Sequence, residues 1–443
     1  MKGQTRKPGT LGYWQLFCFG IMTTPIAMSG LALVMYIPTF YATQMGLGFT
    51  AVGLVVALGR LFDVVSDPLI GFMTDRTQSR FGPRKPWIVI GTPCFAGAVW
   101  LLLVPPETAG MPYLAFACFL FFLCVTVLDI PYSSIGLEIS PDVHERSMVA
   151  GSKAVFQVSG AIIAATLPVA FGLAIPNALA VIASVVAALC LVSLILFLIF
   201  VPERPRAPIS RRTGFFEMVR LVLGQREFRS LVMAFVIVQS ANALTAALAV
   251  LFVTHVIARP DLVAPLVLLL FVSTALLIPV WIMLSRKIGK KQTWQVSILL
   301  CAAALLGAFV LGPGSVLGAV AVFALVGAVF GCDAIMPTSM LADIVWEKER
   351  ETGAQAGLFL AFKNAVSKLT FVIPMALAFP VLDLVAFQRE GANGEMQLMT
   401  LLAFFAGLPI VLRIAAAVYL QRAMIPQPAS HFDAAPEPHA DAA

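Results

Sequence analysis

Charged residues are scarce in this sequence. They account for 12 per cent of its 443 residues, whereas a soluble globular protein carries about a quarter, and this deficit excludes a soluble protein. A β-barrel is also excluded, because the short alternating segments of membrane strands are missing. Hydrophobic residues make up 60 per cent of the chain and form long runs, and a run of about 20 such residues spans a bilayer as a helix. We therefore expect an all-α polytopic membrane protein.

Motifs of enzymes are missing too. The chain has no HExxH, no P-loop, no nucleophile elbow and no GxGxxG before a strand, so we expect no catalytic residue, no enzyme activity and no cofactor. Its seven cysteines lie in apolar runs without CxxC or Cys/His spacing, which indicates neither disulfides nor zinc. The N-terminus lacks a small-residue cleavage site, so no removable signal peptide is expected. A membrane sensor without transport is a remote alternative, because the polar segments are short.

Twelve apolar runs divide the chain into two groups of six. They lie near residues 16–41, 49–73, 87–104, 112–138, 149–172, 177–201, 230–257, 263–285, 294–312, 315–341, 356–386 and 398–421. A polar stretch rich in Pro and Arg separates the sixth run from the seventh. The predicted division is a cytoplasmic N-terminus (1–15), an N-terminal six-helix bundle (16–201), a cytoplasmic linker (202–229), a C-terminal six-helix bundle (230–421) and a disordered cytoplasmic tail (422–443).

The connectors between these runs alternate in charge. The connectors after the even-numbered runs are basic. In the connectors after the odd-numbered runs, the only basic residues are Arg259 and Arg389. Positively charged connectors stay in the cytoplasm, so both termini are expected there, in a bacterial inner (plasma) membrane. The net charge of +6 is spread over short loops, so no nucleic-acid partner is expected. The expected partners of a monomeric chain are the lipid bilayer and a small-molecule solute.

A weak repeat relates the two halves. Gly82 opens a basic cluster before Trp87, and Gly289 opens another before Trp294, 289 − 82 = 207 residues later. Two six-helix halves related by a repeat are the architecture that secondary transporters use for alternating access.

Nine charged residues fall inside the apolar runs at least four residues from either end of a run. An ionisable side chain at bilayer depth costs about 2.5 kcal/mol or more, so each one needs a partner or an aqueous cavity. The nine are Arg60, Asp63, Asp67, Asp129, Lys153, Asp333, Lys363, Lys368 and Arg413. Asp333 and Arg413 show no spacing signal, and we interpret them as local pairing.

Two of these residues, Asp63 and Asp67, lie one helical turn apart. Two neighbouring carboxylates cannot both ionise easily in a low-dielectric site without a cation beside them, which predicts a site for a coupling ion. Ser66, together with Thr126 and Asp129 of the fourth run, is expected to complete the shell, since hard oxygen ligands suit a small cation. We expect the coupling ion to be sodium or a proton. Apart from sodium at Asp63 and Asp67, we expect no bound metal. The alternative is that Arg60 pairs with Asp63, and that this pair only holds helices together and binds no ion.

A substrate site is expected next to the ion site. Asp129 precedes a proline, which bends the helix and frees a carbonyl toward a cavity. Asn364 and Lys368 share one face of the eleventh run. Lys363 lies well round that helix, and extension to the cytoplasmic interface is an alternative for its side chain. The predicted substrate-binding residues are Asp129, Ser133, Lys153, Asn364 and Lys368.

The connector after the second run is predicted to act as a gate. A glycine permits close helix approach, an acid at the helix end can pair with an arginine, and the basic residues can bond to neighbouring helix ends. Such a latch would hold the cytoplasmic side closed. The predicted gating residues are Arg60, Gly71, Asp75, Arg76, Arg80, Arg84 and Lys85.

The pattern from Arg60 to Trp87 resembles the glycoside-pentoside-hexuronide:cation symporter family, the melibiose permease-like branch of the major facilitator superfamily. It reads Arg60-x-x-Asp63-x-x-x-Asp67-Pro68-x-x-Gly71, then Asp75-Arg76-Thr77-x-Ser79-Arg80-x-Gly82 and Lys85-Pro86-Trp87. Support continues in Asp129-Ile130-Pro131-Tyr132, Ala342-Asp343-Ile344-Val345 and Lys368. The resemblance implies twelve helices in two six-helix halves and cation-coupled symport. It also implies that Asp63, Asp67 and Thr126 bind the cation, that Asp129 serves cation and sugar, and that Lys153 contributes to the sugar site.

Departures from this family lie on the substrate side. The first-span acid that grips sugar hydroxyls falls on Ala27, a sugar-packing tryptophan falls on Ser133, and Trp346 and Gln355 replace an acid and an arginine. The leading prediction is cation-coupled symport of a sugar or glycoside-like solute. Because a site without the first-span carboxylate loses a hydroxyl acceptor, no galactoside is assigned. The alternative is the same fold carrying a non-sugar organic anion or amphiphile.

Overall fold

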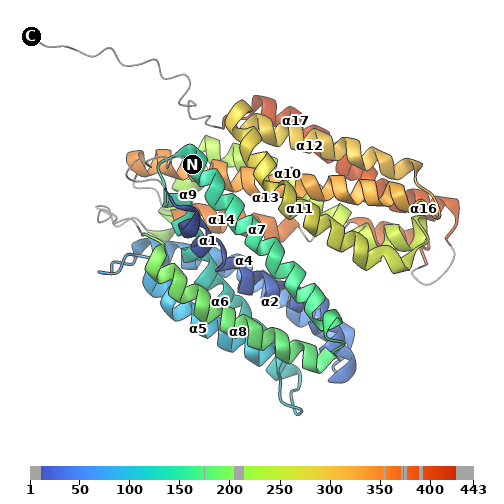
Figure 1. Cartoon of the computed structure of the whole chain (residues 1–443), viewed down its shortest axis with the longest axis horizontal. Coiled ribbons are helices and arrows are strands. Elements are labelled where there is room, and N and C mark those ends of the chain that lie inside the picture. Colours follow the sequence, from blue (N-terminus) through green and yellow to red (C-terminus); the bar gives the residue numbers. More distant parts are fainter. Residues whose placement is uncertain are drawn as a thin grey trace, which may run out of the picture.

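The computed structural model describes residues 11–425 except 174, 204–213, 353–355, 371–372, 374–376 and 389–392. The described elements are all helices. They form two bundles, coloured blue to green and yellow to red in Figure 1. The axes of the two bundles converge where the basic connectors lie and diverge toward the opposite side. We call the first side the basic end, defined by residues 77–84, 139–142 and 201–203 with Gly289. The predicted all-helical fold in two halves is confirmed.

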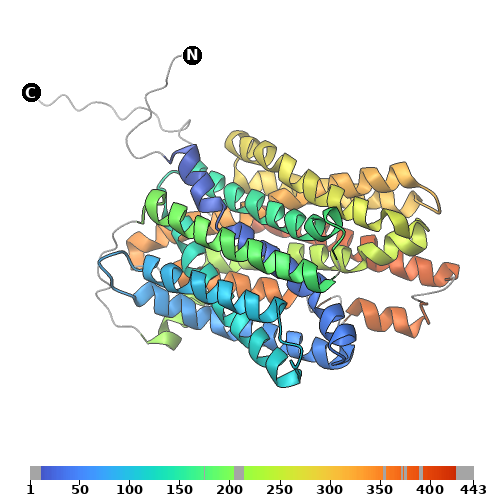
Figure 2. The same ribbon diagram turned by 60° about the horizontal axis from the view of Figure 1, so that its bottom comes forward.

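The first half of the chain folds into one bundle. Its elements are α1 (Tyr13–Gly20), α2 (Thr23–Met35), α3 (Ile37–Thr39), the π-turn η1 (Phe40–Gln44), α4 (Phe49–Arg76), α5 (Lys85–Leu103), α6 (Met111–Glu138), α7 (Val143–Ala170) and α8 (Ile175–Phe200). The α4 helix runs to Arg76, so Asp75 lies in its last turn, and the connector begins at Thr77. Figure 2 shows this bundle from below.

The second half folds into the other bundle. Its elements are α9 (Phe215–Gly224), α10 (Arg226–Leu251), η2 (Phe252–Val256), η3 (Pro260–Leu262), α11 (Val263–Ile288), α12 (Lys290–Leu306), η4 (Gly307–Val310), α13 (Val316–Thr352), α14 (Ala356–Thr370), α15 (Phe379–Leu384), α16 (Glu395–Leu402), η6 (Ala403–Gly407) and α17 (Leu408–Arg422).

Part of the predicted linker is helical. The α9 helix occupies residues 215–224, and its apolar face buries Met218 and Val222, while α10 begins at Arg226 and not near residue 230. An amphipathic decapeptide gains apolar burial by docking on the bundle, and the polar composition of the stretch hid this short face. The predicted N-terminal segment to residue 10, most of the predicted tail (426–443) and Gln355 lie outside the described residues.

Within the described part of the chain, ten helical segments are long and apolar enough to span a membrane. The other two of the predicted twelve are α4, which carries Arg60, Asp63 and Asp67 in its middle, and α14, described over 15 residues with Lys363 and Lys368. The helices that depart most from an ordinary span are therefore those that hold the intramembrane charges. Polar residues inside a span mark functional helices.

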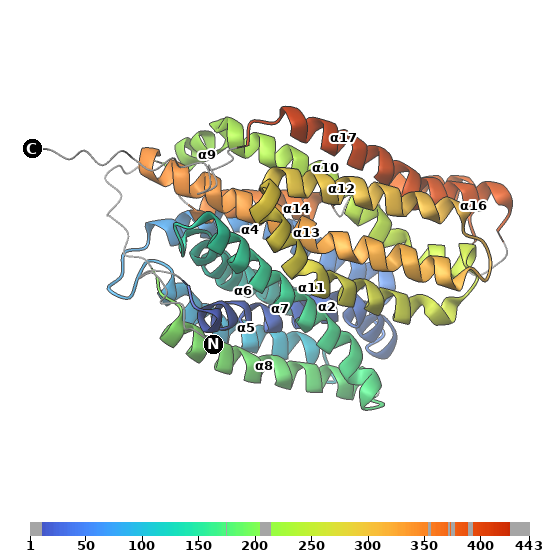
Figure 3. The ribbon, with the colours of Figure 1, turned by 45° about the horizontal axis from the view of Figure 1, so that its top comes forward.

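Each half has its own apolar core. The halves meet where α4 packs on α14, α7 packs on α11 and α13, and α6 reaches α13 and α14; Figure 3 shows α14 beside α4. At the closest approach a Cβ added to Gly71 would lie 2.6 Å from the carbonyl oxygen of Gly357. Any side chain at Gly71 would force these two helices apart.

Candidate functional site

Two aspartates of α4 and one lysine of α14 meet inside the molecule. The Lys368 ammonium lies 2.6 Å from Asp63 Oδ2 and 2.7 Å from Asp67 Oδ2. On α6, Thr126 Oγ1 lies 2.6 Å from Asp63 Oδ1 and 3.0 Å from Asp67 Oδ1, so its one hydroxyl proton is shared between them. The carboxylate side chains are 4% and 1% exposed. The site thus joins three helices and both halves.

Sequence position accounts for this geometry. Asp63 and Asp67 are four residues apart, so a helix stacks them on one face. Asp67 lies nine residues before the end of α4 at Arg76, which is about 13 Å from the basic end at 1.5 Å per residue. The site therefore lies well inside a hydrocarbon layer about 30 Å thick.

Asp63 does not form an ion pair with Arg60, which was its partner in the alternative prediction. The guanidinium of Arg60 lies over the ring of Phe122, 5.9 Å from its centre, and the ion-pair partner of Asp63 is Lys368. The aspartate pair therefore joins the two halves and does not close on its own helix.

A second polar group lies between α6 and α7. The Lys153 ammonium is 2.9 Å from Asp129 Oδ1 and also bonds Ser133 Oγ, while Ser133 donates to Asp129 Oδ1 at 2.9 Å. The Lys153 and Asp129 side chains are 23% and 22% exposed, so the protein does not enclose them fully. Three of the predicted substrate residues are thus brought together.

Other predicted site residues lie apart from these groups. Ser66 Oγ donates to the carbonyl of Asp63 at 3.2 Å, so its hydroxyl is engaged with its own helix and not with the carboxylates. Asn364 is partly buried and makes no hydrogen bond within the described ranges. Lys363 does not extend to the basic end, because its ammonium lies 4.8 Å from the centre of the Phe235 ring on α10. These observations place the residues, and their predicted roles stay predictions.

The predicted latch region is held together by Asp75. Its carboxylate accepts hydrogen bonds from the backbone N–H groups of Gly357 at 3.2 Å and Leu358 at 3.1 Å, at the start of α14. Arg84 NH2 lies 3.0 Å from Asp75 Oδ1 and 2.8 Å from Glu138 Oε1. An acidic side chain is favourable at a helix N-terminus, where it also satisfies free donors. Asp75 therefore ties the first half to the second.

Arg84 is fully enclosed in this latch. Burial opposes its charge, but Glu138 and Asp75 more than compensate and raise the pKa of Arg84 above its ordinary value. Glu203 accepts hydrogen bonds from the backbone N–H groups of Arg84 at 2.8 Å and Lys85 at 3.2 Å, and burial raises the pKa of its carboxyl although these bonds oppose the shift. Glu203 was missed because nothing in its local sequence marks it.

The remaining predicted latch arginines point elsewhere. Arg76 lies over the ring of Phe72, 4.2 Å from its centre, and Arg80 is exposed over Phe81. Both interactions stay within the helix end or the connector. Of the predicted basic latch residues, Arg84 is thus the one that the described contacts place between α4 and α6.

A second set of contacts joins the halves between α7 and α13. Asp343 accepts from Arg146 Nε at 2.7 Å and lies 2.6 Å from the Lys290 ammonium, and Ser147 and Ser339 hydroxyls are 2.8 Å apart. The sequence repeat contains a signal for this second set of contacts, because its residues occupy positions equivalent to those of the latch. Lys290 follows Arg84 by 206 residues and Asp343 follows Glu138 by 205, close to the offset of 207 between the glycines.

Between the ion site and the latch lies a small apolar cluster. Ile70 of α4, Ile130 of α6 and Ala361 of α14 form it, and they are 7%, 1% and 0% exposed. Apolar side chains at this point separate the buried carboxylates from the basic end. The described contacts therefore correspond to a state closed at the basic end.

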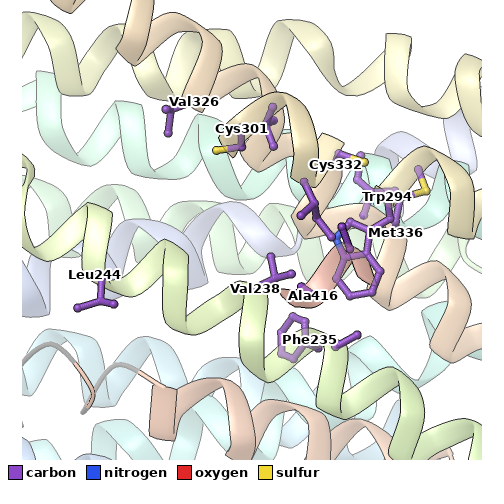
Figure 4. Packing of buried hydrophobic residues seen from close by; sticks show 14 of the residues in the cluster. Phe235, Val238, Leu244, Trp294, Cys301, Val326, Cys332, Met336 and Ala416 are labelled. Atoms are coloured by element: carbon purple, nitrogen blue, oxygen red, sulfur yellow. The ribbon is translucent and has the colours of Figure 1, made fainter. Parts of the chain in front are cut away.

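Asp333 and Arg413 form a buried pair inside the second half. Arg413 NH1 lies 3.4 Å from Asp333 Oδ2, Trp294 Nε1 donates to Asp333 Oδ1 at 2.9 Å, and Asn242 bonds both partners. This local pairing agrees with the sequence interpretation. Figure 4 shows Trp294 among the buried apolar side chains of the second half.

A family match fits this geometry. Residues 18–427 match the family described as MFS/sugar transport protein. The chain belongs to this family. It is accordingly an integral membrane secondary transporter of a small-molecule solute and not an enzyme. The match establishes the major facilitator superfamily, but it does not establish the glycoside-pentoside-hexuronide branch that the motif resembles.

Similar proteins of known name include lipid transporters. The chain is 24% identical over 443 aligned residues to the sodium-dependent lysophosphatidylcholine symporter 1 of Gallus gallus, covering 89% of this chain and 83% of that protein. It is 25% identical over 375 aligned residues to the sphingosine-1-phosphate transporter of Mus musculus, covering 77% and 74%.

Solved structures show the same fold. The fucose:proton symporter of E. coli superposes with a TM-score of 0.66 at 14% identity, over 92% of this chain and 98% of that chain. The human organic anion transporter MFSD10 superposes with the same TM-score, identity and coverage.

Proposed function

We propose that this chain is a sodium-coupled symporter of a lysophospholipid-like amphiphile that works by alternating access. The observation that carries the proposal is the buried pair of Asp63 and Asp67 on one half, bridged by Lys368 of the other half at 2.6 and 2.7 Å. Two carboxylates against one ammonium attract a further small cation. The curated relatives named as sodium-dependent symporters support sodium over a proton.

Sodium would act on the contact between the halves. Thr126 Oγ1 lies 2.6 Å from Asp63 Oδ1 and 3.0 Å from Asp67 Oδ1, so three hard oxygen ligands are grouped there. An ion bound there competes with the Lys368 ammonium for carboxylate charge. Sodium binding therefore weakens a contact that ties the halves together, and so alters the relative stability of the two access states.

An apolar pocket in the second half favours an amphiphile over a sugar. It is a small hollow of about 20 Å³, lined by Thr245, Ala246, Ala249, Leu270, Val322, Phe323, Val326, Phe330 and Phe405. The one polar side chain, Thr245, donates its hydroxyl to the Phe405 carbonyl at 3.1 Å, so no free donor faces a sugar. Such a lining suits an alkyl chain.

The first-span position also disfavours a sugar. Ala27 of α2 packs against Gly160 of α7, where an added Cβ would lie 3.0 Å from the Ala27 Cβ. A sugar site needs buried acceptors for hydroxyl groups, and this helix supplies none at that position. Membership of the glycoside-pentoside-hexuronide branch stays a proposal that concerns the cation half of the site.

The described contacts support one state of the transport cycle. With the basic end taken as cytoplasmic, as the charge bias of the connectors indicates, both termini lie in the cytoplasm and the molecule is closed on that side. Loading from the opposite side, loss of the Lys368 bridge and release of the Asp75 latch would then open the cytoplasmic side. The chain is proposed to work as a monomer in a bacterial inner membrane.

Uptake by purified protein in proteoliposomes tests the proposal. A sodium gradient, compared with a matched potassium gradient, should drive accumulation of radiolabelled oleoyl-lysophosphatidylcholine or oleoyl-lysophosphatidylglycerol. Excess melibiose should not compete. Uptake that is equal in both gradients, or competition by the sugar together with no lipid uptake, would contradict the proposal.

A further inference from the structure

Lys363 is a charged residue inside the bundle that the ion site does not use. Its side chain is partly buried, and its ammonium lies 4.8 Å from the centre of the Phe235 ring. Across the described part of the chain it has no carboxylate within ion-pair distance and no hydrogen bond. Placing a lysine at bilayer depth costs more free energy than a single cation–π contact returns. The charge of Lys363 is therefore not balanced by its protein contacts.

The nearest charges do not neutralise it. Lys363 interacts electrostatically with Lys153, which is unfavourable, and with Asp129, which is favourable. Asp129 already accepts from Lys153 and Ser133. The ammonium groups of Lys153, Lys363 and Lys368 thus all interact with the one carboxylate of Asp129, and an anion between Lys153 and Lys363 would relieve their repulsion.

The charge of the whole region points the same way. Asp333 and Arg413 pair with each other in the second half. The other charged residues predicted inside the spans comprise four cations and three carboxylates, for a sum of +1, which becomes +2 when sodium binds. They are Arg60, Lys153, Lys363 and Lys368 against Asp63, Asp67 and Asp129. A net anion restores neutrality better than a neutral or zwitterionic solute does.

We infer that Lys363, together with Lys153, binds the headgroup of the transported amphiphile and selects a net anionic headgroup, such as a phosphate ester that carries no balancing cation. This inference rests on the proposed function and specifies its substrate class. Lys363 belongs to the second half and Lys153 to the first, so a bound headgroup also bridges the halves. Phe235 is 4% exposed and belongs to the buried apolar cluster of the second half, part of which is drawn in Figure 4, so packing holds the ring that Lys363 contacts.

The same helix leads from this headgroup position to the apolar pocket. Ala246 of the pocket lies eleven residues beyond Phe235 on α10, which is three turns and about 16 Å along the same face. An amphiphile with its anionic group at Lys363 could extend its alkyl chain toward the pocket. This favours a lipid headgroup over a small free anion.

The test compares two lipids with the same acyl chain. Proteoliposomes in a sodium gradient take up radiolabelled oleoyl-lysophosphatidylglycerol, which is anionic, or oleoyl-lysophosphatidylcholine, which is zwitterionic, with glycerol 3-phosphate as a competitor that lacks the chain. The variants are Lys363→Gln, Lys363→Arg and the control Lys287→Gln, whose side chain is exposed at the basic end. Binding of both lipids to the detergent-solubilised full chain is measured in parallel by thermal stabilisation.

The expected result is a preference of about tenfold for the anionic lipid, since one unbalanced charge pair in a partly buried site is worth about that factor. Lys363→Gln should remove this preference while sodium still stimulates uptake, and Lys363→Arg and Lys287→Gln should retain it. Equal use of both lipids by the unaltered chain, or an unchanged preference in Lys363→Gln, would overturn the inference. If glycerol 3-phosphate inhibited uptake as strongly as the unlabelled lipid does, the bound anionic group would be a free anion and not a lipid headgroup. If uptake shows no sodium dependence, the proposed function fails, and the binding preference still tests Lys363.

Discussion

The Lys368 ammonium lies 2.7 Å from Asp67 Oδ2 across 301 residues of sequence. The lysine belongs to the second half and the aspartate to the first, and both lie in the two helices that are least like ordinary membrane spans. In the proposed mechanism, a coupling ion would compete for the carboxylates that hold the halves together. Ion binding and conformational change would then be linked through the same carboxylates.

The Asp75 latch should set the balance between access states. Asp75→Asn keeps the size of the side chain but removes the charge that Arg84 and the start of α14 share. Loss of one partner in a buried charged network costs about 3 kcal/mol or more, so the closed basic end should be depopulated. A cysteine introduced as Ile70→Cys, inside the apolar cluster, should then react faster with a thiol reagent added from that side. Equal reaction rates with and without Asp75→Asn would contradict the latch.

The close approach of α4 and α14 should make Gly71 sensitive to substitution. Gly71→Ala places a Cβ 2.6 Å from the Gly357 carbonyl oxygen, and overpacking of this kind costs about 1–3 kcal/mol. The matched control is Gly53→Ala on the same helix, where a Cβ meets nothing within 4 Å. Thermal unfolding in detergent should show a clear loss of stability for Gly71→Ala and little change for the control. Similar midpoints for the two variants would rule out a tight helix contact at Gly71.

The buried pair of Asp333 and Arg413 should behave as one unit. Asp333→Leu or Arg413→Met alone leaves an unpaired buried charge, which should cost about 3–5 kcal/mol, whereas the double variant should recover much of that loss. Thermal unfolding of the two single variants and the double variant gives the coupling between them. Additive losses would show that the pair, despite its 3.4 Å separation, does not act together.

The apolar pocket should set the preferred chain length of the solute. Ala246→Phe fills part of the lining between α10 and α13, so uptake should shift toward shorter acyl chains, with long chains reduced about tenfold because each buried CH₂ contributes about 0.8 kcal/mol. Ala51→Phe on α4, outside this lining, serves as the size control. Competition by lysophospholipids of graded chain length measures the shift. An unchanged chain-length profile would show that the pocket does not bind the acyl chain.

The fold, which is confirmed, and the proximity of Asp63 to Asp67 could be predicted because both follow from local patterns, whereas the role of the two carboxylates as a cation site stays a prediction. Long apolar runs give spans, basic connectors give a common end, and a four-residue spacing stacks Asp63 on Asp67. The predicted latch also came from local signals, since Gly71 and Asp75 sit at a helix end beside a basic connector.

What could not be predicted depends on which side chains meet across the halves. Glu203 sits under the latch because a distant backbone turn presents free N–H groups to it. The role of Lys363 was left open because helical spacing shows that it departs from the Lys368 face but not that Phe235 lies beneath it. Ser66 is predicted to join the ion shell because its hydroxyl is a hard oxygen ligand beside the two aspartates, but in the structure this hydroxyl bonds a carbonyl of its own helix.

Sodium movement driven by the solute tests the central claim most directly. Proteoliposomes with radiolabelled sodium outside, and no imposed gradient, should take up sodium when oleoyl-lysophosphatidylglycerol is added, because one carrier cycle moves both. Asp67→Asn should abolish this uptake, and Asp261→Asn, an exposed aspartate paired with Arg259, should retain it. Lipid transport without accompanying sodium, or equal sodium uptake in Asp67→Asn and the unaltered chain, would contradict the assignment of Asp63 and Asp67 as the coupling site.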